Sequence, residues 1–186
     1  MLLSSAPPRL RAREVARPFH IVLVEPEIPP NTGNVARLCV ASGAALHLVG
    51  KLGFRIDEHA VRRAGLDYWD ALELHQHRTF AEAEANLAMP SPPAGRAPRS
   101  FLFSGHAEQS YLDVDFCRGD RLVFGRESVG LPRELLEARA ADVVGIPLLG
   151  PVRSLNLANS VAIALYEGLR RLGLLAGAGL RTSHGG

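Results

Sequence analysis

The stretch "HIVLVEPEIPPNTGNVARLC", residues 20–39, leads from a strand through a proline-rich turn into a helix. Its segment "IVLV" is apolar at every position, which is typical of a strand that is buried on both faces. The three prolines fix backbone φ in the turn, and Asn31 or Thr32 offers a side-chain oxygen to cap the helix that follows. A strand that passes directly into a helix in this way is the repeating unit of an α/β fold.

The same alternation continues along the chain. Further apolar runs predict strands at 46–49, 99–104, 121–125 and 142–146, and helical patterns are expected at 32–42, 132–141 and 155–172. Because the strands are apolar throughout, we expect a mostly parallel sheet flanked by helices. We interpret residues 19–173 as a single domain, 1–18 as a basic flexible tail and 174–186 as a flexible glycine-rich tail.

Composition limits the class of protein. Hydrophobic residues make up 47% of the 186 and charged residues 22%, and no apolar run reaches the ~18 residues that a membrane span needs. Cys39 and Cys117 are too few and too far apart for a disulfide framework or a CxxC metal site, so a reducing cytosol is expected. A net charge of +2 and a pI near 8.8 permit a polyanionic partner without requiring one.

Ligands of open parallel sheets bind beyond the carboxyl ends of the strands. Three loops qualify here, namely the proline-rich turn, "GRESVGLP" at 125–132 and "PLLGPVRSLN" at 147–156. The chain has no GxGxxG, GxxxxGK[ST], GxSxG or HExxH motif, so dinucleotide, P-loop, hydrolase and zinc-protease sites are not favoured. His75 and His77 form an HxH pair that would share one face of a strand, but we predict no metal site.

The three loops carry motifs that resemble a known family. These are N-x-G-x-x-x-R (Asn31, Gly33, Arg37), F-G-x-E-x-x-G-L (from Phe124), and S-L-N (from Ser154) with Y-E at 166–167. In this order they resemble the motifs of the SpoU branch of the SPOUT superfamily of RNA methyltransferases. The words "EPEIPPNTGN", "RLC", "RRAGLDY" and "GLP" are similar to those of the tRNA wobble-nucleotide ribose 2′-O-methyltransferases. The resemblance covers about residues 19–173.

This resemblance implies an α/β fold with a C-terminal trefoil knot, the SPOUT fold. It also implies a cytoplasmic homodimer that uses S-adenosyl-L-methionine, without a metal, and releases S-adenosyl-L-homocysteine. The implied substrate is the anticodon stem-loop of tRNA, methylated on the ribose of nucleotide 34, a cytidine or a modified uridine. Local sequence patterns alone would not have suggested a knot, because true knots are very rare.

The resemblance also assigns site residues. Cofactor contacts are expected at Phe103, Gly125, Ile146, Ser154 and Leu155. Catalytic roles are expected for Asn31, Arg37, Glu127, Ser154 and Asn156. RNA contacts are expected at Arg62, Arg63, Tyr68 and Tyr166. The residue types fit independently, since glycine admits close backbone approach, apolar walls suit adenine, and arginines interleaved with aromatic rings suit phosphates and unstacked bases.

The chemistry suggests roles for three of these residues. A ribose hydroxyl is barely acidic, so the site must take or share its proton and stabilise negative charge. The pKa of a guanidinium lies above about 12, so we interpret Arg37 as an orienting and charge-stabilising donor rather than a base. Asn31 either caps its helix or orients Arg37 or the ribose. Glu127 either pairs with an arginine, for which Arg37 is a candidate, or makes a simple salt bridge in its turn.

Several alternatives remain open from sequence. Gly125 could serve only its turn and Ile146 only the core, Tyr166 could be a core or subunit-interface residue, and Trp69 could belong to the core. Arg126 could add a phosphate contact. At the level of the whole chain, the rivals are a noncatalytic RNA-binding module, a SpoU-type enzyme acting elsewhere on RNA, and a phosphate-binding enzyme that uses the helix entrance at Asn31.

Overall fold

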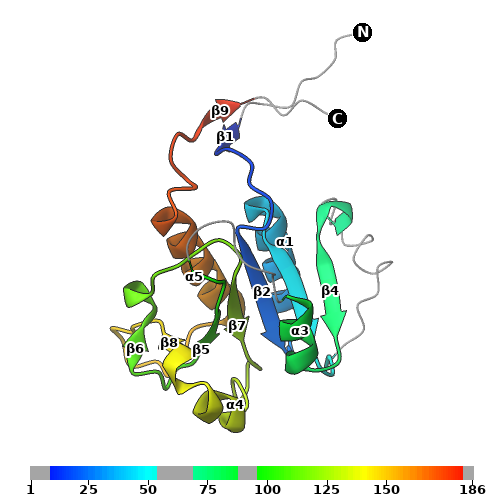
Figure 1. Ribbon diagram of the computed structural model, residues 1–186, viewed down its shortest axis with the longest axis vertical. Coiled ribbons are helices and arrows are strands. Elements are labelled where there is room, and N and C mark those ends of the chain that lie inside the picture. The colour runs from blue at the N-terminus through cyan, green and yellow to red at the C-terminus, as the bar shows by residue number, and fades with distance from the viewer. Residues whose placement is uncertain (1–8, 54–68, 88–95, 182–186) are drawn as a thin grey trace.

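The computed structural model describes residues 9–53, 69–87 and 96–181, and its main feature is a seven-stranded sheet with helices on both faces (Figure 1). The strands are β2 (Phe19–Val24), β3 (Ala45–Val49), β4 (Leu74–His77), β5 (Ser100–Phe103), β6 (Gln109–Ser110), β7 (Asp120–Phe124) and β8 (Val143–Gly145). The helices are α1 (Pro29–Ser42), α3 (Phe80–Asn86), α4 (Arg133–Ala138) and α5 (Leu157–Arg171). Short 3₁₀ turns lie at Trp69–Ala71, Tyr111–Asp113 and Ala140–Asp142.

The strand order across the sheet is β4-β3-β2-β7-β5-β8-β6, and every neighbouring pair is parallel. Alternate residues of β2 point to opposite faces. Ile21 and Leu23 join a core with α1 and α5, whereas Val22 and Val24 join a core with α3 and α4. Both sets are buried, so β2 is apolar throughout because it lies between two layers of helices. The expected mostly parallel sheet with flanking helices is confirmed.

The sequence predicted most of these elements but not all. Strands expected at 20–24, 46–49, 99–104, 121–125 and 142–146 correspond to β2, β3, β5, β7 and β8. The helix expected at 132–141 is shorter, because α4 ends at Ala138 and a separate 3₁₀ turn follows Arg139. Neither β4 nor α3 was predicted, since "ELHQH" at 73–77 lacks the apolar run of a buried strand.

The start of α1 corrects one sequence prediction. The helix begins at Pro29 after Ile28, with prolines in its first turn, where proline's missing N–H costs no helical hydrogen bond. Asn31 therefore lies inside the first turn, and neither it nor Thr32 is the cap that the sequence suggested. The predicted end is confirmed, since Gly43 follows the helix with φ of 71°, a left-handed conformation that glycine adopts readily.

A second, two-stranded sheet lies beyond the main one (Figure 1). Its strands β1 (Arg9–Arg11) and β9 (Gly179–Arg181) pair antiparallel, and the register joins Arg9 to Arg181. Both strands belong to segments that the sequence analysis interpreted as tails, and the sequence did not predict their pairing. The pairing brings the two ends of the described chain together.

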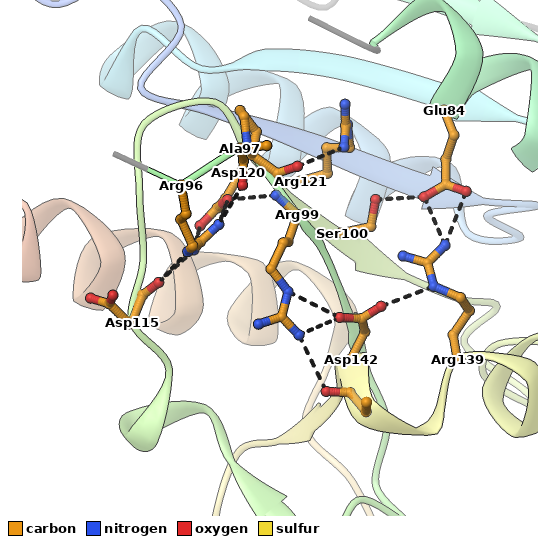
Figure 2. Close-up of polar contacts among 12 residues, drawn as sticks. Glu84, Arg96, Ala97, Arg99, Ser100, Asp115, Asp120, Arg121, Arg139 and Asp142 are labelled. Carbon is orange, nitrogen blue, oxygen red and sulfur yellow. Dashed lines mark hydrogen bonds and ion pairs between the residues drawn. The ribbon is translucent and has the colours of Figure 1, made fainter. Parts of the chain in front are cut away.

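A charged network ties together the segments that enter β5 and β7 (Figure 2). The Asp120 carboxylate is completely buried and accepts hydrogen bonds from Arg96 Nη1 at 2.8 Å and from the backbone N–H groups of Arg99 and Cys117 at 2.8 and 2.7 Å. The Arg99 guanidinium pairs in turn with Asp142. A buried carboxylate with several donors is satisfied, so this network fixes the amino-terminal edge of the sheet.

The structure also bears on three expectations about composition. None of the helices in the described ranges is long and apolar enough to cross a membrane. Within those ranges, no group of three or more His, Cys, Asp or Glu residues is arranged to hold a metal ion. Cys39 and Cys117 are both free, and burial raises the pKa of the Cys39 thiol to about 12.

Histidines form a chain of contacts across β2, β3 and β4. His20 Nδ1 lies 2.9 Å from His47 Nε2, and His47 Nδ1 lies 3.0 Å from His77 Nε2. The ring of His75 stacks on that of His47, which confirms that His75 and His77 share one face. Burial and the Arg121 charge lower the pKa of His20 to about 4, and burial beside the rings of His20, His75 and His77 lowers the pKa of His47 to about 3. The folded protein therefore holds these rings neutral.

We predict that this histidine chain makes the fold sensitive to mild acid. The pKa values of His20 and His47 lie below the 6.5 of an unfolded histidine, so only the unfolded state binds their protons between pH 6.5 and about 4. Their stabilising contribution is complete above pH 6.5 and is lost as the pH falls toward 4. Each such proton costs about 1.4 kcal/mol per pH unit.

The test is urea unfolding at several pH values between 5 and 6.5. His47→Gln should reduce the slope of unfolding free energy against pH, while His106→Gln, at an exposed position, should leave it unchanged. The groups that face these rings are Glu73, Arg17, Arg121, His75 and His77, and all are present in both variants. Equal slopes for the two variants would contradict the prediction.

Candidate active site

Three loops meet at the carboxyl ends of β2, β7 and β8. The strands β2 and β7 are neighbours, and the chain leaves β2 toward β3 on one side, whereas β5 and β8 lie on the other. The order of strands therefore reverses between β2 and β7, which is the place where open α/β sheets bind their ligands. The loops here span residues 25–28, 125–132 and 146–156, and they correspond to the three loops expected from sequence, of which the third was expected at 147–156.

The carboxylate of Glu127 joins the first two loops. It accepts hydrogen bonds from the backbone N–H groups of Glu27 at 2.8 Å and Ile28 at 3.2 Å, and from Asn31 Nδ2 at 2.9 Å. These donors all lie at the entrance of α1, where unpaired N–H groups and the helix dipole favour a negative charge. Glu127 thus stabilises the helix entrance as an anion would, from a loop about 100 residues further along the chain.

Two asparagines extend this contact to the third loop. Asn156 Nδ2 donates to Asn31 Oδ1 at 2.9 Å, and Asn156 Oδ1 caps α5 by accepting from Ala158 N at 2.9 Å and Asn159 N. Every amide in this chain donates in one direction, from the α5 backbone through Asn156 and Asn31 to Glu127. Such aligned hydrogen bonds polarise one another, so the three residues act as one rigid unit.

The charge state of Glu127 follows from these contacts. Burial alone would raise its pKa, but hydrogen bonds from Asn31 and from backbone N–H groups outweigh that effect and lower the pKa. Glu127 is therefore ionised at neutral pH and remains so in mild acid. A carboxylate held in this way is a positioning group and a poor acceptor for a proton from substrate.

The turn at 125–130 explains the need for glycine at position 125. A Cβ built on Gly125 would come within 2.1 Å of the Gly130 carbonyl carbon, because the turn folds back on itself. Arg126 and Gly130 exchange two backbone hydrogen bonds, and Gly130 has φ of 76°. The turn itself thus requires Gly125, as one of the two interpretations from sequence expected. A contact between the Gly125 backbone and a ligand stays a prediction.

The other residues expected around a cofactor differ in exposure. The Phe103 ring is buried and stacks on Phe124 at 4.6 Å, so only its backbone could reach a ligand. Ile146 and Leu155 are half-buried, and Ser154 is exposed. Ile146 packs against the core and still presents part of its surface at the end of β8, so the core and the ligand interpretations are both compatible with its place.

Comparison with known protein families identifies the family of this chain. Residues 18–166 match the model of the SpoU rRNA Methylase family. The chain belongs to the SpoU methylase family. Among curated relatives, the tRNA (cytidine(34)-2′-O)-methyltransferase of Acidovorax sp. (strain JS42) is 47% identical over 154 residues, which cover 82% of this chain and 91% of the relative.

Solved structures agree with this assignment. A structure described as giving insights into the 2-OH methylation of C/U34 on tRNA has a TM-score of 0.72 and 46% identity, and the match covers 83% of this chain and 95% of that one. The AdoMet-bound rRNA methyltransferase from Sinorhizobium meliloti has a TM-score of 0.67 and 26% identity, with 85% of this chain and 59% of that one covered. Both share the SpoU fold with this chain.

In this SpoU protein, Arg37 lies apart from the Glu127–Asn31–Asn156 unit. It is exposed and lies six residues beyond Asn31 in α1, so the two residues occupy different faces of the helix. Arg37 shares its face with Gly33, one turn before it. A Cβ on Gly33 would meet no atom within 4 Å among the described residues.

Of the four residues expected to contact RNA, the structure describes Tyr166. Arg62, Arg63 and Tyr68 lie outside the described residues. Tyr166 projects from α5 with 44% of its surface exposed, which excludes the core interpretation within this chain and leaves the subunit-interface and RNA interpretations open. Trp69 is half-buried and packs against the core, as one of its two interpretations expected.

Sequence reasoning missed a second contact between the first two loops. Ser128 donates through its backbone N and its Oγ to the Glu27 carboxylate, each at 3.0 Å. The Arg126 guanidinium, suggested from sequence as a phosphate contact, pairs with Glu25. The sequence contains both sides of these contacts, the two acids in "EPE" and the Arg126–Ser128 segment. It does not show that they meet, because their contact depends on β2 and β7 being neighbours in the sheet.

We predict that Asn31→Ala weakens the fold more than an ordinary surface change. The substitution removes the donor to Glu127 and the acceptor for Asn156, and leaves polar groups without partners, at a cost of about 1–3 kcal/mol. Asn34→Ala is the matched control, because Asn34 is exposed on the same helix and should change stability by less than about 0.5 kcal/mol. Equal unfolding free energies for the two variants, measured with urea, would contradict the prediction.

Proposed function

We propose that this protein is an S-adenosylmethionine-dependent tRNA methyltransferase that acts on the ribose 2′-oxygen of nucleotide 34. The observation that carries this proposal is the Glu127–Asn31–Asn156 unit, which joins three motif loops at the ligand-binding edge of the sheet. Membership in the SpoU family and the printed functions of relatives at 46–47% identity support the reaction and the position. The implied substrate is the anticodon stem-loop.

The residues around the loops fit the adenine end of a methyl donor. Ile146 and Leu155 present partly exposed aliphatic surface suited to a flat base, and Ser154 has an exposed hydroxyl beside them. The backbones of Gly125 and Phe103 complete the proposed contacts. An AdoMet-bound relative supports S-adenosylmethionine, which supplies the methyl group of the reaction and leaves as S-adenosyl-L-homocysteine. The proposed chemistry uses no metal.

Arg37 is the proposed catalytic group. Its guanidinium stays protonated and can donate hydrogen bonds to the 2′-oxygen or the adjoining phosphate as negative charge develops. Glu127, Asn31 and Asn156 position the loops, since their polar groups already bond one another. Ser154, near the end of the third loop, is proposed to contribute a polar contact at the site.

The same structure argues against the phosphate-binding alternative. An anion at the entrance of α1 would need the N–H groups of Glu27 and Ile28, and the Glu127 carboxylate already occupies both. A phosphate there would also face the charge of that carboxylate at close range.

Several finer properties belong to the same proposal. We propose a cytoplasmic homodimer with a C-terminal trefoil knot and a single domain over residues 19–173, with the segments 1–18 and 174–186, expected as tails, joined through the pairing of β1 with β9. Exposed apolar side chains on α5, Ile163 and Tyr166, lie one turn apart and suit a contact with a second copy. In such a dimer Arg37, which lies on a different face of α1 from Asn31, can contribute to the site of the partner copy. RNA contacts are proposed for Arg62, Arg63, Tyr68 and Tyr166.

We predict that Arg37→Ala reduces methyl transfer by more than about 100-fold while binding of the methyl donor is largely retained, because the guanidinium acts on the transition state. The assay is methyl transfer to bulk tRNA, with mass mapping of the modified nucleotide and calorimetric titration of the donor. Arg118→Ala is the control, since Arg118 is exposed near the start of β7, at the opposite end of the sheet.

The outcomes separate the alternatives. A modified nucleotide other than 34 would favour a SpoU-type enzyme of different specificity. Donor binding without transfer by the wild type would favour a noncatalytic module. Binding of nucleotide phosphates without the donor would favour the phosphate-binding enzyme.

We also predict that the wild-type chain sediments as a dimer at micromolar concentration. Ile163→Arg should shift it toward the monomer, because a charge buried in an apolar contact is costly. Leu10→Arg is a matched control on an exposed apolar residue of β1, away from α5. A wild-type monomer, or a dimer unaffected by Ile163→Arg, would contradict this interface.

A further inference from the structure

The net positive charge of the chain comes from its two ends. Five of the 21 basic residues, but one of the 19 acidic residues, lie in the segments 1–18 and 174–186. With histidines neutral, the net charge is therefore +4 for these two segments together and −2 for residues 19–173. A phosphate backbone is attracted by positive charge, and this attraction supplies much of the affinity of RNA-binding and DNA-binding proteins. By its net charge alone, the domain with the candidate active site does not attract RNA.

The structure gathers basic residues on the β1–β9 ribbon, the two-stranded sheet at the pole remote from the three motif loops (Figure 1). Strand β1 carries Arg9 and Arg11, and Arg13 follows it, and all three are exposed. Arg9 and Arg11 lie on one face of the strand, because side chains two residues apart point to the same side. Neither strand of the ribbon falls within residues 18–166, which match the family model, so the ribbon is an addition to the matched domain.

These arginines differ from others near the same pole because they have no acidic partner. Arg17 pairs with Glu73, and Arg171 donates to two backbone carbonyl groups. The three arginines of residues 9–13 form no ion pair within the part of the chain that the structure describes. Their guanidinium groups are thus available to an anion from outside the protein.

The base of the ribbon is fixed against the body of the domain. The Arg17 N–H donates to the Gly43 carbonyl at 2.8 Å, and a Cβ on Gly43 would lie 2.5 Å from the Val15 carbonyl oxygen. The chain therefore packs closely against the end of α1 just after β1. On the side of β9, Leu174 and Leu175 pack against the core. The ribbon thus holds its arginines at a defined place on the molecule.

Resting on the proposed function, we propose that the β1–β9 ribbon is a second RNA contact, which binds the phosphate backbone of tRNA through Arg9, Arg11 and Arg13. Guanidinium groups donate charge-assisted hydrogen bonds to phosphate oxygens, and such contacts carry no sequence information. The contact offsets the negative net charge of residues 19–173. Because the ribbon is remote from the motif loops, it raises the affinity for tRNA and takes no part in methyl transfer.

The composition of the ribbon favours RNA over an anionic membrane surface. A segment that lies on a membrane combines basic residues with a broad apolar face. In β1, Leu10 is the single apolar residue between two arginines, with 70% of its surface exposed. One leucine provides little apolar surface to insert, whereas three arginines suit a chain of phosphates.

The test measures the Kd for bulk tRNA over a series of salt concentrations. The triple variant Arg9→Gln, Arg11→Gln, Arg13→Gln should raise this Kd about 10-fold at low salt and reduce the slope of log Kd against log salt by about 2, because each phosphate contact contributes about 0.7–0.9. The KM for tRNA should rise with the Kd, while kcat and the Kd of the methyl donor change by less than about 2-fold, as expected for lost binding energy that is uniform along the reaction.

Two controls separate the charge of the ribbon from folding and from charge elsewhere. Lysine at the same three positions keeps the charge and should keep the tRNA affinity within about 3-fold, since lysine also binds phosphate. Arg78→Gln removes one charge between β4 and α3, where the side chain is 93% exposed, and should change the salt slope less than Arg11→Gln does. Equal Tm values for the wild type and the triple glutamine variant confirm that the variant is folded.

Three outcomes overturn the proposal. The first is an unchanged Kd, KM and salt slope in the triple glutamine variant. The second is an equal effect of Arg78→Gln and Arg11→Gln, which would show a general effect of net charge. The third is reduced binding to phosphatidylglycerol vesicles with unchanged binding to tRNA, which would identify a membrane contact.

The proposed function can fail separately from this inference. A wild-type protein that binds tRNA but transfers no methyl group would refute the proposed function. The Kd and the salt slope of the ribbon variants would then still decide whether the ribbon binds RNA.

Discussion

The structure depends on one directed chain of hydrogen bonds, from the amino end of α5 through Asn156 and Asn31 to Glu127. Each amide has its orientation decided by its neighbour, because Asn156 must accept from the α5 backbone and can then only donate to Asn31. Three segments separated by up to 125 residues thereby take fixed relative positions. The negative charge of Glu127, at the end of these hydrogen bonds, is compensated by the entrance of α1, and within the described ranges of the chain this half-buried carboxylate has no ion-pair partner.

The sheet supplies the frame on which this chain of contacts acts. The strands β2 and β7 are adjacent and parallel, so their following loops leave from the same edge. Two separate apolar layers bury both faces of β2, which makes the direction of that edge rigid. At the opposite edge the Asp120 network fixes how the chain enters β5 and β7. The polar contacts at the two edges thus fix the positions of the loops and of the entering segments, whereas the buried apolar faces between them stabilise the sheet.

The sequence predicted those parts of the fold whose cause is local. Apolar runs identify β2, β3 and β7, and glycine after a helical pattern identifies the end of α1. The sequence did not predict β4, because this strand has no apolar pattern and its histidines contact His47 on the neighbouring strand. The role of Asn31 was also ambiguous, because capping is a local interaction whereas its real partners lie 96 and 125 residues away. Glu25 and Glu27 were overlooked for the same reason, since only the adjacency of two strands reveals their partners.

The pairing of β1 with β9 has a practical consequence for handling the protein. Arg9 and Arg181 are register partners, so the chain enters and leaves the described structure at one place, beyond the edge of the sheet that is remote from the three loops (Figure 1). A surface linker that replaced the residues before Arg9 or after Arg181 would therefore start from the same pole of the molecule. Immobilisation through such a linker leaves the opposite pole turned toward solution, where an RNA as large as tRNA has free approach.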